Sequence, residues 1–121
     1  MKRIIIAALI TFIVPSAYAN WKNGNDLYES CELYQALKQR QLSTLEQVIS
    51  GECMTYTMGW LDGNETSLMP LICVPENVKF GSLVDMLIKF LEENPAERHY
   101  PANSIMFNAF KEFECPDPFI E

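Results

Sequence analysis

The sequence contains few of the residue types with which enzymes build active sites. His99 is the only histidine among 121 residues, and it lies in the polar stretch ENPAERHY. A catalytic cysteine needs a free thiolate beside a base, and neither Gly59 nor Gly63 follows a strand as a phosphate-binding loop requires. Glu112 and Glu114 lie beside an apolar stripe, with no sign of the cleft that acid–base catalysis needs. We therefore expect no enzymatic activity, no cofactor and no metal site.

Basic residues are also scarce. Nine lysines and arginines stand against sixteen acidic residues, which gives a formal net charge of −7 at pH 7. Nucleic acids and anionic lipids are bound through Lys and Arg side chains that displace counterions. The sequence therefore predicts no nucleic-acid partner and no binding to anionic membranes. An acidic surface suits a basic protein partner, or simply favours solubility.

Long apolar runs are absent except at the N-terminus. Two basic residues precede the apolar stretch 4–14, and residues 17–19 have the small-x-small pattern of a cleavage site. The run is too short to cross about 30 Å of hydrocarbon. Residues 1–19 are therefore predicted to be a signal peptide for export, with an uncleaved N-terminal anchor as the alternative. Residues 20–121 then form a single domain with no membrane segment.

Four cysteines lie in the predicted mature chain: Cys31, Cys53, Cys73 and Cys115. An even number of cysteines in a short exported chain is typical of disulfides. No pair has the C-x-x-C spacing, and a single histidine offers little for a zinc site, so a structural metal or a thioredoxin-like redox pair is poorly supported. Two disulfides have three possible pairings.

Apolar residues in the mature chain recur at helical spacing, and no stretch alternates as a strand does. The predicted helices cover 26–40, 43–63, 82–94 and a last segment that begins near Pro101. Pro70 and Pro75 exclude a continuous helix in the stretch 64–78. We expect an all-α fold, a small bundle of four to five helices cross-linked by two disulfides.

Side-chain caps mark where two of these helices begin. Ser43 with Glu46 and Thr44 with Gln47 form two overlapping capping boxes. Gly51 could break the helix that follows, so the stretch 43–63 is predicted as one helix or two. Further along the chain, Ser82 with Asp85 predicts the cap of the third helical region.

This helical order favours one disulfide pairing. If the first two helices form an antiparallel hairpin, Cys31 and Cys53 lie at the same height. Cys73 precedes the third helix and Cys115 follows the fourth, so a second hairpin would bring these two together. We favour Cys31–Cys53 and Cys73–Cys115, each of which would stabilise the fold by about 3–4 kcal/mol in the loop-entropy model.

The order of these features resembles the Rap/Tai family of exported immunity proteins, which protect bacteria against type VI secretion amidase effectors. The resemblance covers about 26–116. The residues that carry it are Cys53, Tyr56, Gly59, Asp62, Cys73, Pro75, Leu91, Pro95 and Cys115. The family pattern usually ends in Pro-Cys, where this chain has Glu114 before the cysteine and Pro116 after it.

The resemblance implies both a fold and a role. The implied fold is small and all-helical, and it is often a homodimer. The implied role is to bind a cell-wall amidase in the periplasm and to occlude its active-site cleft. A periplasmic acid-stress chaperone, or another small exported helical binding protein, is the alternative.

The stretch CMTYTMGWLDG places Tyr56, Gly59, Trp60 and Gly63 three or four residues apart, on one side of a helix. A glycine inside a helix costs about 1 kcal/mol relative to alanine. We interpret these residues as a close-packing seam, in the core or in a dimer, with a ligand site as the alternative. In such a seam, glycine lets a neighbouring helix or the Cys73 loop approach while the aromatic side chains fill the space beside it.

Two surfaces are candidates for partner binding. The first is a segment predicted to project between two helices, with the candidate residues Asn64, Glu65, Ser67, Leu68 and Met69. The alternative is an ordinary connection that tucks Leu68 and Leu71 into the core. The second surface is an acidic group that could pair with a basic target, formed by Glu92, Glu93 and Glu97.

Overall fold

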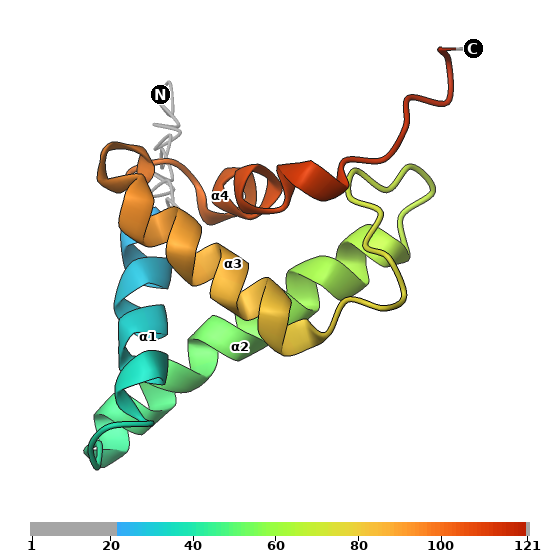
Figure 1. The fold of residues 1–121 in the computed structure, drawn as a ribbon. Coiled ribbons are helices and arrows are strands. Elements are labelled where there is room, and N and C mark those ends of the chain that lie inside the picture. The colour runs from blue at the N-terminus through green and yellow to red at the C-terminus, as the bar shows by residue number, and fades with distance from the viewer. Residues whose placement is uncertain (1–21, 121) are drawn as a thin grey trace, which may run out of the picture.

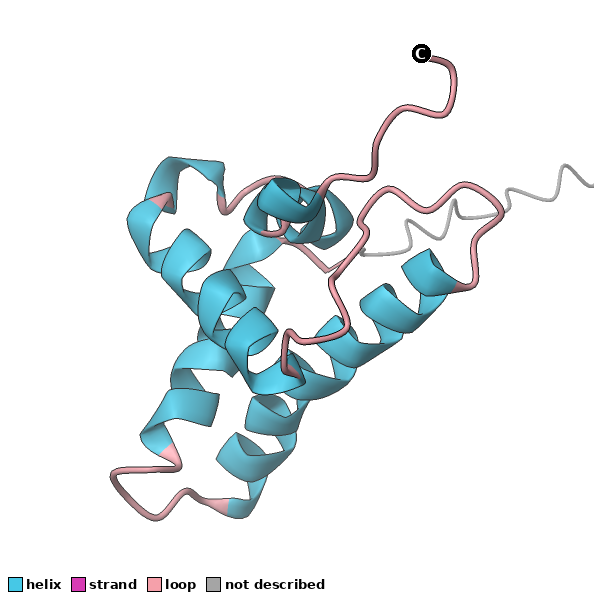
Figure 2. Cartoon of the chain, turned by 45° about the vertical axis from the view of Figure 1, so that its right-hand side comes forward, coloured by secondary structure: helices cyan, strands magenta, loops and turns pink. Residues whose placement is uncertain are grey.

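The computed structural model describes residues 22–120, and this part of the chain folds into helices joined by short connections (Figure 1). The elements are α1 (Gly24–Ala36), α2 (Thr44–Glu65), α3 (Phe80–Glu93), the one-turn 3-10 helix η1 (Pro95–Glu97), α4 (Ala102–Ala109) and the one-turn 3-10 helix η2 (Lys111–Phe113). Within 22–120 there is no strand beyond two isolated bridges, and helices dominate the view in Figure 2. The predicted all-α bundle is confirmed. The predicted signal peptide, 1–19, lies outside the described residues.

The second helical region is one continuous helix, α2, and Gly51 does not break it. It begins after Ser43, whose hydroxyl accepts from the amide of Glu46, while the Glu46 carboxylate accepts from the amide of Ser43 at 2.8 Å. The predicted Ser43 capping box is therefore confirmed, and Thr44 is the first helical residue rather than a cap. The Arg40 guanidinium, 2.8 Å from Glu46, and the Ser43 amide lower the pKa of that carboxyl to about 2.

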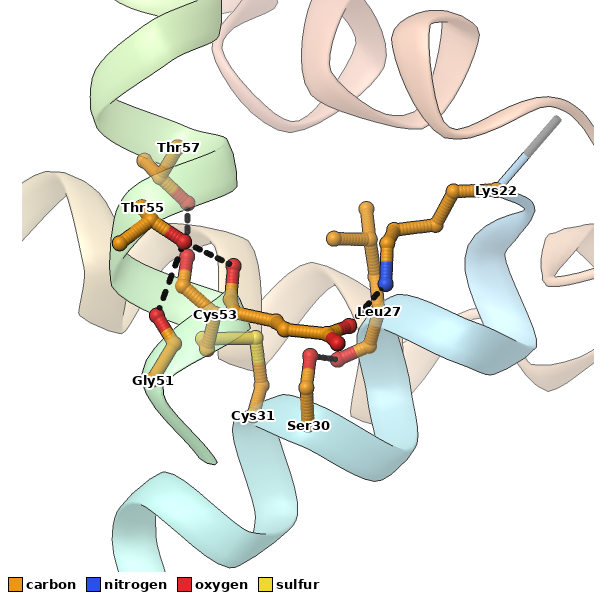
Figure 3. The surroundings of a disulfide bond; sticks show 9 residues. Lys22, Leu27, Ser30, Cys31, Gly51, Cys53, Thr55 and Thr57 are labelled. Atoms are coloured by element: carbon orange, nitrogen blue, oxygen red, sulfur yellow. Dashed lines mark hydrogen bonds and ion pairs between the residues drawn. A yellow bond between two sulfur atoms is a disulfide. The ribbon is translucent and has the colours of Figure 1, made fainter. Parts of the chain in front are cut away.

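Both predicted disulfides are confirmed: Cys31–Cys53 and Cys73–Cys115. The first crosses the α1–α2 hairpin and is fully buried. Figure 3 shows it between the two helices, with Lys22 nearby. The ammonium group of Lys22 forms an ion pair with Glu52, the residue before Cys53. In the loop-entropy model, separations of 22 and 42 residues correspond to about 3–4 kcal/mol each.

The core forms where α3 and α4 lie over the α1–α2 hairpin. α3 has a strongly amphipathic pattern and buries one full stripe, while α4 adds three residues and Phe110 follows it. The buried side chains of these two segments are Leu83, Val84, Leu87, Ile88, Leu91, Ala102, Ile105, Met106 and Phe110. Burying a side chain of this kind contributes about 1.5–3 kcal/mol, so this stripe holds the two halves of the chain together.

The predicted cap at Ser82 and Asp85 is wrong. α3 begins two residues earlier, at Phe80, and Lys79 precedes it without any side-chain cap. The reason is packing, because Phe80 lies against the core and extending the helix keeps its ring there. α3 ends before Pro95 as predicted, and the Asn94 side chain donates to the carbonyl of Phe90 at 2.9 Å.

The start of α1 is docked against the link between α3 and α4. The amide of Gly24 donates to the Tyr100 carbonyl at 3.0 Å, and the amide of Asn25 donates to the Arg98 carbonyl at 2.8 Å. The Arg98 guanidinium lies 3.5 Å from the centre of the Tyr28 ring. A Cβ on Gly24 would be 2.7 Å from the Arg98 backbone, so this position requires glycine. No local pattern in the sequence indicates this glycine.

The interpretation in which a neighbouring helix or the Cys73 loop of the same chain approaches Gly59 and Gly63 is wrong. Both glycines are exposed, and a Cβ at either position would meet nothing within 4 Å. Thr57 faces the core, fully buried, and at about 100° per residue Gly59 lies nearly opposite it. The aromatic half of the interpretation has a counterpart in the structure, because Trp60 packs on Phe110 with ring centres 6.1 Å apart.

These two environments predict opposite effects of the same substitution. Gly59→Ala should raise the free energy of unfolding by about 0.5–1 kcal/mol, because alanine is the better helix former and the site is open. Gly24→Ala should lower the melting temperature by several degrees, because the new methyl group would collide with the Arg98 backbone. Thermal unfolding followed by circular dichroism measures both. A Gly59→Ala protein that melts below the wild type would contradict the open site.

Candidate partner-binding surface

The connection between α2 and α3 begins with a loop, residues 66–71, that presents apolar side chains to solvent. Leu68 is fully exposed, Met69 is 61 % exposed and Leu71 is 58 % exposed. The alternative in which Leu68 and Leu71 tuck into the core is therefore wrong. Ile72 is the buried residue of this segment, at 2 % exposure. The loop projects from the helical body at the end of α2 (Figures 1 and 2).

Asn64 holds the two ends of this loop together. Its side-chain amide donates to the carbonyl of Ile72 at 2.6 Å, and its carbonyl accepts from the amides of Leu71 and Ile72 at 2.9 and 3.0 Å. All three bonds are to main-chain atoms of the same chain. Asn64 is therefore a positioning residue for the loop, and its amide group is already engaged before any partner arrives.

Short-range hydrogen bonds shape the loop between its ends. The Thr66 hydroxyl donates to the carbonyl of Asp62 at 2.9 Å and so closes the last turn of α2. The Ser67 hydroxyl accepts from the amide of Met69 at 3.2 Å. Glu65, the last residue of α2, is exposed beside them. The polar side chains Thr66 and Ser67 fold the loop, and the apolar ones face outward.

The far end of the loop is joined to the segment that follows α4. The amide of Cys73 donates to the Phe113 carbonyl at 2.7 Å, and the amide of Cys115 donates to the Leu71 carbonyl at 2.9 Å. The disulfide Cys73–Cys115 closes the same junction. In Figure 1 the yellow-green loop lies beside the start of the red C-terminal segment. The loop is thus fixed covalently and by hydrogen bonds.

The structure does not bring the predicted acidic group to this loop. Glu92 and Glu93 lie at the C-terminal end of α3, and Glu97 lies in η1, which follows it. The connection that contains the loop joins the opposite, N-terminal end of α3. A helix of that length spans about 20 Å. Glu93 lies 4.0 Å from Lys89 on an exposed face, a geometry that contributes little to stability. The two candidate surfaces are therefore separate.

The remaining motif residues have structural positions in or beside the helices. Tyr56 is half-buried against the core, and this burial raises the pKa of its phenol. Asp62 is exposed near the end of α2. The Pro75 carbonyl accepts from the amide of Val78 at 3.0 Å in the turn before α3, and Pro95 is the first residue of η1. These residues shape turns and packing.

The described residues contain no group of three or more His, Cys, Asp or Glu side chains placed to hold a metal ion. His99 lies against Tyr100, with ring centres 4.2 Å apart, on the exposed link between η1 and α4. Among the helices at 22–120, none has the length and apolar content needed to cross a bilayer.

Together these observations define a small all-helical protein with two disulfides and an exposed apolar loop. The model of the family of Rap1a immunity proteins matches residues 23–115, most of the chain. The chain belongs to this family, as the resemblance predicted. Comparison with curated proteins and with solved structures found no match. Proteins of an immunity family act in general by binding an effector protein rather than by catalysis.

The position of Asn64 predicts what its loss would do. Asn64→Ala removes three hydrogen bonds to the loop backbone and should speed amide exchange at Leu71 and Ile72 about tenfold, because each bond contributes about 1 kcal/mol. Hydrogen exchange followed by mass spectrometry measures this. Asn108→Ala, at an exposed position on α4, is the matched control. Unchanged exchange in the loop of Asn64→Ala would show that the Cys73–Cys115 disulfide and the main-chain hydrogen bonds beside it hold the loop without Asn64.

Proposed function

We propose that this chain is a periplasmic immunity protein that binds a type VI secretion peptidoglycan amidase effector and occludes its active-site cleft. The observation that carries the proposal is the loop 66–71, which is fixed at both ends and exposes Leu68 and Met69 in a member of the Rap1a immunity protein family. Such a loop can fill a groove on a partner without any chemistry of its own.

The fixed shape of the loop favours tight binding. Ordering a mobile loop on association costs free energy, and a loop already held in place avoids most of that cost. Leu68 and Met69 are large apolar groups that would leave water on entering a groove. Burial of a few such anchors contributes most of the affinity of many interfaces. The loop therefore has the two properties that an occluding inhibitor needs.

Export to the periplasm is supported by the disulfides. Two disulfides in a small domain are typical of an oxidising compartment. The predicted signal peptide at 1–19 gives the route, and a peptidoglycan amidase would act in the same compartment. The acidic chain, with a net charge of −7, is suited to a partner with a basic rim.

The proposal predicts that the loop carries inhibition. Leu68→Ser combined with Met69→Ser should weaken binding at least about tenfold without changing the melting temperature, because both side chains are exposed and lie outside the core. The matched control is Leu45→Ser combined with Val48→Ser, two similarly exposed side chains near the start of α2.

Co-purification from periplasm with mass spectrometry identifies the partner, and titration of its peptidoglycan hydrolysis at neutral pH gives the affinity. A partner that is not a peptidoglycan hydrolase would overturn the proposed target. Full inhibition by the loop variant would place the binding site elsewhere. Binding confined to about pH 2–3, with partial unfolding, is the result that an acid-stress chaperone would give.

We also propose that the protein is a homodimer, which the resemblance to the Rap/Tai family supports. Sedimentation equilibrium of the exported protein should then give about twice the mass of one chain. A single-chain mass across the accessible concentration range would exclude a stable dimer. Because inhibition is measured separately, this result would leave the proposed role of the loop intact.

A further inference from the structure

The segment that follows η2 also exposes large apolar side chains. Phe119 is 83 % exposed and Ile120 is 75 % exposed. Together with Leu68, they are the three most exposed large apolar side chains among residues 22–120. Exposed apolar side chains that cluster, rather than lie scattered, mark interaction sites. The sequence analysis assigned no role to this tail.

The start of the tail, 116–118, lies beside the loop 66–71, and Phe119 and Ile120 follow it as the tail runs outward (Figure 1). The tail and the loop are joined by the Cys73–Cys115 disulfide and by the hydrogen bond from the Cys115 amide to the Leu71 carbonyl. A hollow of about 500 Å³ is lined by residues of both segments, among them Leu68 and Met69 from the loop and Pro116 and Pro118 from the tail. The two segments therefore form one concave surface.

The tail also has a local fold of its own. The Asp117 carboxylate accepts from the amide of Phe119 at 2.9 Å, and its carbonyl accepts from the amide of Ile120 at 3.3 Å. Pro116 and Pro118 restrict the backbone on either side of Asp117. These restraints reduce the conformational freedom that binding would otherwise have to remove.

The size of a stable interface calls for more than the loop. Stable complexes bury about 800 Å² on each partner, contributed by about 20–30 residues. The loop 66–71 supplies far fewer residues than an interface of that size contains. The tail adds apolar surface, because Pro116 and Pro118 line the shared hollow and Phe119 and Ile120 follow them. A partner that covers the hollow would contact both segments at once.

Charge around the hollow indicates what kind of partner fits. Two of the residues that line it, Glu114 and Asp117, are acidic, and the exposed Glu112 lies just before them in η2. Glu112 and Glu114 take part in none of the ion pairs formed within 22–120. One basic side chain, Lys111, is exposed in the same region. A partner surface with an apolar centre and Lys or Arg residues at its rim would complement this arrangement.

We propose that the tail 116–120 and the loop 66–71 form one continuous effector-binding surface, whose occupant is an effector protein with an apolar groove rimmed by basic residues. This inference rests on the proposed immunity function and adds a second segment to its site. The Cys73–Cys115 disulfide keeps the end of the loop next to the start of the tail.

The test compares three double variants against the peptidoglycan hydrolase recovered with the wild-type protein. Phe119→Ser with Ile120→Ser should weaken binding at least about tenfold, as should the loop variant Leu68→Ser with Met69→Ser. Leu45→Ser with Val48→Ser should bind as the wild type does. All three should keep the wild-type melting temperature, because every substituted side chain is exposed. Isothermal titration calorimetry measures the affinities.

The outcomes separate this inference from the proposed function. Wild-type affinity in the tail variant, together with weak binding in the loop variant, would overturn the inference and leave the immunity function standing. Recovery of no peptidoglycan hydrolase would overturn the proposed function itself. A tail variant that loses self-association but keeps its affinity for the hydrolase would assign the tail to a second copy of this chain and overturn the inference. If the partner has a basic rim, wild-type binding should be weaker in 0.5 M salt. The double variant Glu112→Gln with Glu114→Gln should then show a smaller effect of salt on its affinity.

Discussion

The disulfide between Cys73 and Cys115 is the constraint on which the exposed surface depends. It joins the loop that follows α2 to the segment that follows α4, two parts of the chain that are 42 residues apart. The main-chain hydrogen bonds between Cys73 and Phe113 and between Cys115 and Leu71 flank it. This junction fixes both the end of the loop 66–71 and the start of the tail. The exposed side chains of the loop, such as Leu68, therefore have defined positions although no helix covers them.

The other disulfide, Cys31–Cys53, has a different physical role. It is fully buried between α1 and α2, and the buried hydroxyls near it, Ser30 and Thr57, donate to carbonyls of their own helices at 3.0 and 2.7 Å. No polar atom there is left without a partner among the described residues. This bond stabilises the hairpin, and the hairpin in turn supports the stripe of α3 that forms the core. One disulfide thus stabilises the body and the other positions the surface.

Much of the fold followed from the sequence because its signals are local. Helical periodicity located the helices, the Ser43 capping box located the start of α2, and an even cysteine count with a hairpin geometry gave both disulfides. The errors arose where tertiary packing decides. Periodicity predicts that Gly59 and Trp60 lie near one another on a helix. It does not predict which face of that helix the rest of the chain covers. The close contact that requires glycine lies instead at Gly24, against a backbone 74 residues away that no local pattern could indicate.

The candidate site was predictable in part for the same reason. The sequence placed the loop between two helices, since Pro70 and Pro75 exclude a helix there, and Leu68 with Met69 stood out as apolar in a polar connection. Whether these side chains face water depends on Asn64, whose amide binds the backbone where the loop returns at Ile72. The tail gave no periodic signal, and its proximity to the loop follows from the disulfide.

The proposed function, inhibition by shape, would place two opposing requirements on the protein. Its recognition loop must be rigid, because ordering it on binding would cost free energy, yet its apolar side chains must stay out of its own core to remain available. Here the main chain provides the rigidity: Asn64 and the backbone of Phe113 and Cys115 use the amides and carbonyls of the loop, and Leu68 is left fully exposed. The cost is exposed apolar surface on a small domain, which the excess of acidic residues offsets by keeping the free protein soluble. If the proposed partner has a basic rim, the same acidity would also favour their encounter, so one charge distribution would serve both solubility and recognition.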